Sequence, residues 1–176
     1  MKRNNVAVER VEKTLAEFRA EPGKARRTQR VEGVWNLIEG KPQFSATVAF
    51  DGKSAVLEAD QPSFLGGGGA QPGPILYCLF GLAACYAGTF ATTAAMMGVE
   101  LTSLKVVAEN DVNFSPVLGL AETPPIERVR LIVQVSSPAP QAKLQEVETL
   151  ASQRCPAVYC LTHPIPLETR LELKSA

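Results

Sequence analysis

Four cysteines carry the most reactive side chains of this sequence, and their surroundings differ. Cys155 follows Arg154 and precedes Pro156. Proline is favoured in the first turn of a helix, and both a helix N-terminus and an adjacent cation lower the pKa of a thiol. Judged by its neighbours in sequence alone, Cys155 is the better activated cysteine.

Cys78 and Cys85 lie within an uncharged stretch, 75–99. Their spacing places both on nearly the same face of a helix, and Gly81 and Gly88 each follow three residues later. Glycine inside a helix costs about 1 kcal/mol relative to alanine, which indicates that another backbone or a substrate approaches this face. Tight helix packing around inert buried thiols is the alternative. Because Cys85 lies about 16 Å into the helix, its activation requires an arginine from elsewhere.

Other chemistries find little support in the sequence. The glycines at 66–69 are not followed by the Gly-Lys-Ser/Thr of a phosphate-binding loop. A four-cysteine zinc site is disfavoured because no Cys-x-x-Cys spacing occurs. The single histidine, His163, excludes a multi-histidine metal site and makes a Ser-His-Asp triad a poor interpretation. We therefore predict chemistry without a metal or cofactor.

Composition predicts one domain in a reducing compartment. The chain has 176 residues, of which 45% are hydrophobic, enough for a full core. Eighteen basic residues balance eighteen acidic ones, so nucleic acid and anionic membranes are not expected partners. The N-terminus lacks the apolar run of a signal peptide, and we expect a cytoplasmic protein in which thiols stay reduced.

The uncharged stretch 75–99 also meets the length criterion for a transmembrane helix. Its alanine, glycine and threonine content, the absence of basic flanks and its position between segments that are typical of soluble strands favour a buried central helix. A helix that is apolar on every side has to be covered all round, by the sheet and by another helix or a second copy of the chain.

The remaining pattern predicts an α+β fold with an antiparallel sheet. In chain order, we expect a helix over 5–20, three strands between 27 and 60 with a hairpin at Asp51-Gly52, the central helix, strands over 103–114 and 126–135, a helix over 140–154, and a final strand over 165–173. No linker or repeat divides the chain, so residues 1–176 form a single domain with an N-terminal helical extension over 1–26.

Several motifs occur in a recognisable order along most of the chain. They are the glycine-rich loop ending in Gly73-Pro74, the sequence GLAAC with Cys85, two paired strands, and RCPAVYCL with Cys155-Pro156. This order resembles the OsmC-like proteins, a family that includes the organic hydroperoxide resistance proteins. The N-terminal helix, followed by a strand with Arg30 and Trp35, is similar to the branch of the family that has such an extension.

The resemblance implies an intertwined α+β homodimer in which antiparallel sheets wrap around long central helices and the active sites lie at the subunit interface. In the peroxidase members the helix cysteine attacks an organic hydroperoxide, becomes a sulfenic acid and is resolved by the second cysteine, and a dithiol reductant restores both thiols. These roles fall on Cys85 and Cys155. Arg30 is the best match for the arginine that stabilises the thiolate, and Arg27 is the second.

The chain departs from the family pattern in two respects. Peroxidase members carry a glutamate about ten residues before the helix cysteine, whereas residues 74–77 contain no acid. Cys78 and Cys160 are additional and are candidates for alternative resolving thiols. Two functions therefore stay open: a thiol peroxidase, for which Tyr77, Phe80, Met96 and Met97 would form a hydrophobic site, and an OsmC-like protein without peroxidase activity that binds a small hydrophobic or thiol-reactive ligand at the dimer interface.

Overall fold

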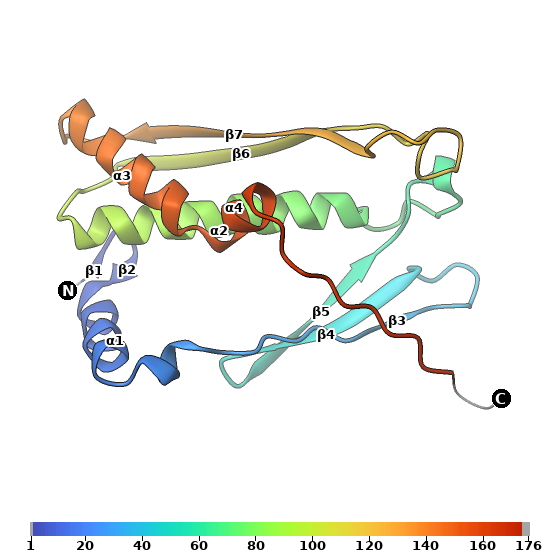
Figure 1. Cartoon of the computed structure of the whole chain (residues 1–176), viewed down its shortest axis with the longest axis horizontal. Coiled ribbons are helices and arrows are strands. Elements are labelled where there is room, and N and C mark those ends of the chain that lie inside the picture. The colour runs from blue at the N-terminus through green and yellow to red at the C-terminus, as the bar shows by residue number, and fades with distance from the viewer. Residues whose placement is uncertain (1, 174–176) are drawn as a thin grey trace.

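The structure is a computed structural model that describes residues 2–173. It has the mixed α and antiparallel β composition that the sequence predicts (Figure 1). In chain order the elements are β1 (Lys2–Arg3), β2 (Val6–Ala7), α1 (Val8–Ala20), η1 (Pro22–Ala25), β3 (Gly33–Trp35), β4 (Phe44–Phe50), β5 (Lys53–Ala59), η2 (Ser63–Leu65), α2 (Pro74–Met96), β6 (Ser103–Val112), β7 (Ile126–Ser136), α3 (Gln141–Arg154) and α4 (Pro156–Thr162).

The long helix α2 runs through the middle of the molecule (Figure 1). It begins at Pro74, whose fixed φ suits the first helical position. The antiparallel pair β6–β7 lies along one side of α2, and α3 also packs against that side. Phe90 of α2 and Val147 of α3 are buried together at the centre of this core. The main core is thus built by α2, α3 and one hairpin.

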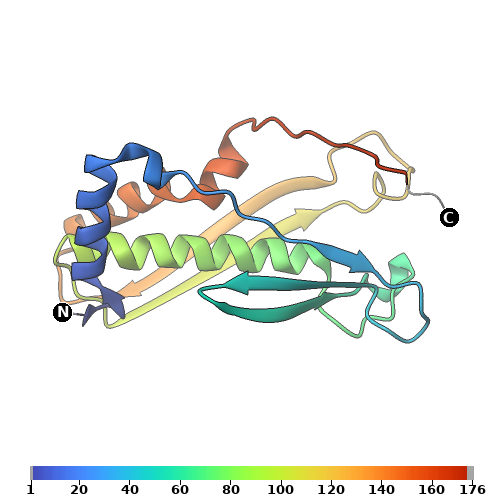
Figure 2. The same cartoon turned by 90° about the horizontal axis from the view of Figure 1, so that it is seen from below.

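The second sheet has the order β3–β4–β5 and is antiparallel throughout. Its hairpin turns at Asp51 and Gly52, which adopt φ angles of 43° and 73°, as the Asp-Gly pair predicts. The cross-strand register places Trp35, Phe44 and Ala59 on one face. Figure 2 shows this sheet beside α2, where the Tyr77 hydroxyl donates a hydrogen bond to the carbonyl of Glu58.

Two predicted elements differ at the chain ends. The first helix begins at Val8 instead of residue 5, because Asn4 and Asn5 adopt left-handed conformations in a short hairpin formed by β1 and β2. The Asn4 side chain donates to the Val99 carbonyl and accepts from the Leu101 N–H, and thereby anchors the residues that follow α2. The N-terminal extension is therefore a hairpin followed by a helix.

The predicted strand over 165–173 is wrong for the single chain. These residues are extended in parts but pair with no strand, and their apolar side chains are exposed. Pro164 and Pro166 lack the N–H that a ladder needs, and no strand of the described residues pairs with this segment, although both larger sheets have free edges. The segment has the alternating apolar and polar residues of a strand, but this pattern does not lead to pairing within one chain.

Helix α2 is covered more completely in its C-terminal half than in its first turns. Tyr86, Phe90 and Ala94 are at most 2% exposed, whereas Leu76 and Phe80, near the start of the helix, are 58% and 71% exposed. Among the described helices, α2 is the one long and apolar enough to cross a membrane, a test that core helices of soluble proteins also pass. The apolar sequence of α2 therefore predicts more complete burial of this helix than a single chain provides.

Candidate functional site

Cys85 and Cys155 lie in contact. The Cys155 thiol donates a hydrogen bond to the Cys85 sulfur, with 3.6 Å between the two Sγ atoms, and both residues are free thiols. Cys85 comes from the middle of α2, and Cys155 occupies the single position between α3 and α4, where Pro156 starts the next helix. A disulfide needs an S–S distance of about 2.0 Å, so a small displacement of the side chains brings the sulfurs to bonding distance.

Burial raises the pKa of the Cys85 thiol. A backbone hydrogen bond from Ala157 opposes this rise, whereas Cys155, through a hydrogen bond and its charge when ionised, and ionised Cys160 raise the pKa further. Ala157 lies in the first turn of α4, so the helix N-terminus that the sequence associates with Cys155 acts on Cys85. The surroundings within one chain therefore disfavour the Cys85 thiolate.

A cavity of about 580 Å³ opens beside Cys85 between α1, α2 and the α3–α4 junction. Ala84 and Gly88 form its floor on α2, Val11 and Leu15 form a wall on α1, and Arg154 lies at the junction. Arg154 is the arginine that lines this cavity. The sequence shows its proximity to Cys155 but not to Cys85, because that relation depends on how α3 packs across α2.

Arg30 lies elsewhere in the single chain. It forms an ion pair with Glu32 in the extended segment before β3, and both side chains are largely exposed. Arg30 does not line the cavity that contains Cys85. One chain thus brings the two predicted thiols together but leaves the predicted thiolate stabiliser apart from them. Arg27 lies in the same exposed segment.

The predicted hydrophobic residues do not share one pocket. Met96 lines the cavity beside Cys85, Met97 packs against the main core, and Phe80 is exposed. Tyr77 lines a separate apolar cavity of about 410 Å³ with Trp35 on the inner face of the three-stranded sheet. These residues surround α2 on different sides, so a single chain contains no continuous substrate pocket made of them.

Gly81 and Gly88 have open space beside them. A Cβ atom added at either glycine would meet no other atom within 4 Å. The close approach that their positions predict is therefore not made by the described residues of this chain.

Two acidic sites lie outside this arrangement. Asp60, at the end of β5, is 3% exposed; one carboxylate oxygen accepts from the Ala70 N–H, and the other has no partner in the described structure. The sequence-based prediction does not include this buried acid, because it considers only residues 74–77, the first turn of α2, for the missing glutamate. Asp60 fixes the glycine-rich loop, where a side chain at Gly68 would approach its carboxylate to 3.1 Å.

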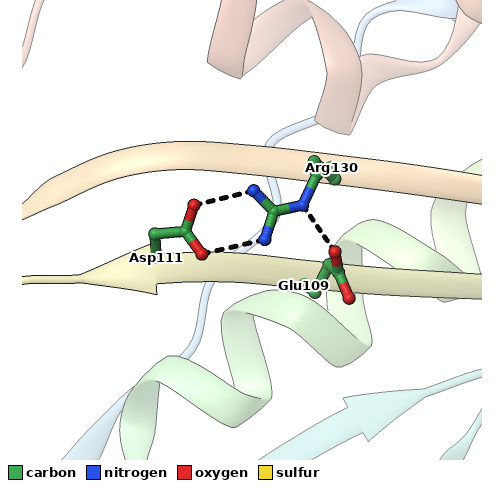
Figure 3. Close-up of polar contacts among 3 residues, drawn as sticks. All are labelled: Glu109, Asp111 and Arg130. Atoms are coloured by element: carbon green, nitrogen blue, oxygen red, sulfur yellow. Dashed lines mark hydrogen bonds and ion pairs between the residues drawn. The ribbon is translucent and has the colours of Figure 1, made fainter.

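The strongest ion cluster of the described residues joins β6 and β7 (Figure 3). Arg130 donates to both oxygens of Asp111, at 2.7 and 2.8 Å, and to Glu109. Hydrogen bonds from Arg130 lower the pKa of Asp111, and those to Asp111 and Glu109 raise the pKa of Arg130. Core side chains occupy the alternate positions of both strands, so the cluster faces away from the thiols.

The sequence was compared with protein families and with known proteins. The family model described as OsmC-like protein matches residues 66–170, a range that includes both thiols of the site. No curated protein matches the sequence.

Two solved structures illustrate the likeness in fold. An OsmC-like protein from Mycoplasma pneumoniae is 23% identical with a TM-score of 0.58, and the match covers 77% of this chain and 87% of that one. An organic hydroperoxide resistance protein OsmC from Legionella pneumophila, also described as a predicted redox protein, is 16% identical with a TM-score of 0.56, covering 77% and 90%.

Proposed function

Because the chain belongs to the OsmC-like family, we propose that it is a cysteine peroxidase that reduces organic hydroperoxides. The observation that carries this proposal is the contact between two free thiols, Cys85 and Cys155, at an Sγ–Sγ distance of 3.6 Å. Such a pair forms a disulfide readily once one sulfur is oxidised. The reducing cytoplasm is the compartment in which both thiols would start in the reduced state.

The proposed reaction uses only thiol chemistry. The Cys85 thiolate attacks the terminal oxygen of the hydroperoxide, the O–O bond breaks, and the alcohol leaves with a proton while Cys85 becomes a sulfenic acid. The Cys155 thiolate then attacks the Cys85 sulfur, the S–O bond breaks and water leaves, which gives the disulfide. A dithiol reductant returns two electrons and two protons by thiol–disulfide exchange.

Activation of Cys85 requires a cation that a single chain does not place effectively, since burial raises the pKa of this thiol. Arg154 lines the adjoining cavity and is one source. The second source is Arg30 of a second copy of this chain. A nearby positive charge favours the thiolate and lowers the pKa of the nucleophile.

A homodimer also explains two uncovered apolar surfaces. One is the N-terminal part of α2, with Leu76 and Phe80 exposed. The other is the inner face of the β3–β5 sheet, where Trp35 and Phe44 are 50% and 38% exposed around a cavity of about 410 Å³. Both surfaces are apolar and exposed in one chain, so the sheet of one copy can cover the helix of the other. The site is then completed at the interface.

Stoichiometric oxidation tests the peroxidase function. Reduced protein is mixed with one equivalent of cumene hydroperoxide, and the remaining hydroperoxide and free thiols are measured. We expect the wild type to lose two thiols per hydroperoxide. Cys155→Ser combined with Cys160→Ser should still consume hydroperoxide but stop at a sulfenic acid that dimedone traps, because Cys160 is the other thiol that acts on Cys85. Cys78→Ser, two turns earlier on the same helix, is the matched control and should behave as wild type. Unchanged consumption by Cys85→Ser would overturn the proposal.

The second candidate is a binding protein without peroxidase activity. The raised pKa of Cys85 and the absence of an acid at 74–77 favour it. The cavity beside Cys85 would then hold a small hydrophobic or thiol-reactive ligand. Hydroperoxide consumption that does not depend on Cys85, together with saturable binding of a fluorescent apolar probe that Ala84→Trp abolishes, would favour this function over the peroxidase.

A further inference from the structure

Cys78 and Cys160 line the same cavity, apart from the thiol contact of the proposed reaction. The cavity measures about 340 Å³ and lies between α2, α4 and the β6–β7 pair, with Leu82, Ile126 and Val129 among its apolar walls. Both cysteines are free and exposed. The two side chains therefore come from different helices but line one cavity.

The cysteines of this cavity lie on the same elements as the two site cysteines or directly beside them. Cys78 lies two helical turns before Cys85 on α2, and Cys160 lies on α4, the helix that follows Cys155. The Cys160 thiolate acts electrostatically on Cys85, so the two groups lie within short range. The four thiols thus lie where α2 meets α4 and the residue before it, with one cysteine of each pair on α2.

The pairs differ in access to solvent. Cys155 is 1% exposed, whereas Cys78 and Cys160 are both exposed. Thiol–disulfide exchange requires the attacking sulfur to reach a disulfide sulfur directly, so burial slows reduction by a bulky dithiol. A disulfide between Cys85 and Cys155 would be protected from the protein that must reduce it, and a disulfide between the exposed cysteines would not.

We propose that Cys78 and Cys160 are a second redox couple, which receives the disulfide from Cys85 and Cys155 and presents it to the reductant. The oxidant is the organic hydroperoxide of the proposed function, on which this inference rests. First, the Cys160 thiolate attacks the Cys85 sulfur and Cys155 leaves as a thiolate. Next, the Cys78 thiolate attacks the Cys160 sulfur and Cys85 leaves as a thiolate. One disulfide is exchanged for another, and no net electrons are consumed.

Disulfide mapping over time tests this relay. Protein is oxidised in parallel with one equivalent of cumene hydroperoxide or diamide, quenched with N-ethylmaleimide and digested with chymotrypsin. Trypsin is unsuitable because no lysine or arginine lies between Lys53 and Lys105, so Cys78 and Cys85 share one peptide. Chymotrypsin cleaves after Phe80 and Tyr159 and separates all four cysteines.

In the wild type, the Cys85–Cys155 disulfide should appear first and decline while the Cys78–Cys160 disulfide rises. Cys78→Ser should stop the relay at Cys85–Cys160, and Cys160→Ser should stop it at Cys85–Cys155. Cys85→Ser has no disulfide to pass on and should form Cys78–Cys160 more slowly; an equal rate would overturn the relay. A wild-type disulfide that stays on Cys85–Cys155 with both oxidants would also overturn it.

Reduction kinetics give an independent readout. With thioredoxin as the probe, oxidised Cys160→Ser should be reduced at least tenfold more slowly than wild type, while the small reductant dithiothreitol should reduce both within about twofold. Equal thioredoxin rates would contradict the relay. The diamide arm separates the two proposals: transfer after diamide without any reaction with hydroperoxide refutes the peroxidase and keeps the relay, and the converse result refutes only the relay.

Discussion

The two halves of α2 are both apolar in sequence but differ sharply in structure. The C-terminal half, with Tyr86, Phe90 and Ala94, is buried against β6–β7 and α3, whereas Leu76 and Phe80 in its first turns remain exposed. Hydropathy therefore indicates that a surface has to be covered, but not which molecule covers it. The first two experiments below test whether a second copy covers these exposed turns.

Truncation of one phenylalanine in each half of α2 gives the largest expected contrast. Phe90 is 1% exposed, so Phe90→Ala should lower the free energy of unfolding by about 3–5 kcal/mol through lost burial and a cavity. Phe80→Ala, on the same helix but 71% exposed, should cost below about 1 kcal/mol at concentrations where the chain is monomeric. Urea unfolding measures both. Equal losses would mean that the first turns of α2 are already packed within one chain.

A charge introduced in the exposed first turns of α2 should weaken the proposed dimer. Phe80→Asp is expected to weaken self-association by about 30-fold or more, because a central aromatic contact contributes about 2 kcal/mol and a buried carboxylate adds a desolvation cost. Sedimentation velocity in detergent-free buffer measures the effect. Gln145→Asp, exposed on α3, is the matched control and should leave association unchanged. A wild type that requires detergent would instead favour the membrane interpretation of α2.

Two arginine variants show which copy activates Cys85. Burial raises the pKa of this thiol, and Arg154 lines the same cavity but does not act on it measurably in one chain. We therefore expect Arg30→Ala to slow alkylation of Cys85 by iodoacetamide about tenfold at pH 7, which corresponds to one pKa unit. Arg154→Ala should have the smaller effect. The thiolate fraction rises with pH below the pKa. The alkylation rates of Arg30→Ala and wild type should therefore converge in alkaline buffer. A larger effect of Arg154→Ala would place activation within one chain.

The smallest expected effect is on the pH dependence of stability and comes from the buried Tyr86 of α2. Tyr86→Phe removes the hydrogen bond to Ser152 and should cost about 1 kcal/mol at pH 7. Burial raises the pKa of Tyr86, so the folded state retains a proton that the unfolded chain loses above about pH 10, and stability falls as pH rises. Urea unfolding from pH 8 to 11 should show a smaller decline for Tyr86→Phe than for wild type. A parallel decline would assign the effect to other groups.

Local signals predicted much of the fold because the structure uses them locally. Asp51-Gly52 forms the expected turn, and Pro74 begins the expected helix. The contact of Cys85 with Cys155 follows from the family resemblance. The interaction of Ala157 with Cys85 does not, because the direction of a first-turn N–H depends on how α4 docks on α2. That Arg154 also lines the cavity beside Cys85 could not be predicted either, because it depends on how α3 packs across α2.

The unpaired segment 164–173 also bears on how the protein behaves in concentrated solution. A strand-like stretch with alternating apolar side chains is a template for edge-to-edge association between molecules. Here Pro164 and Pro166 interrupt the row of donors. Charged side chains oppose stacking at the polar positions, namely Glu168, Arg170 and Glu172. The segment therefore combines a motif for intermolecular β-pairing with gatekeepers against aggregation, and neutralising its three charges would remove much of that protection.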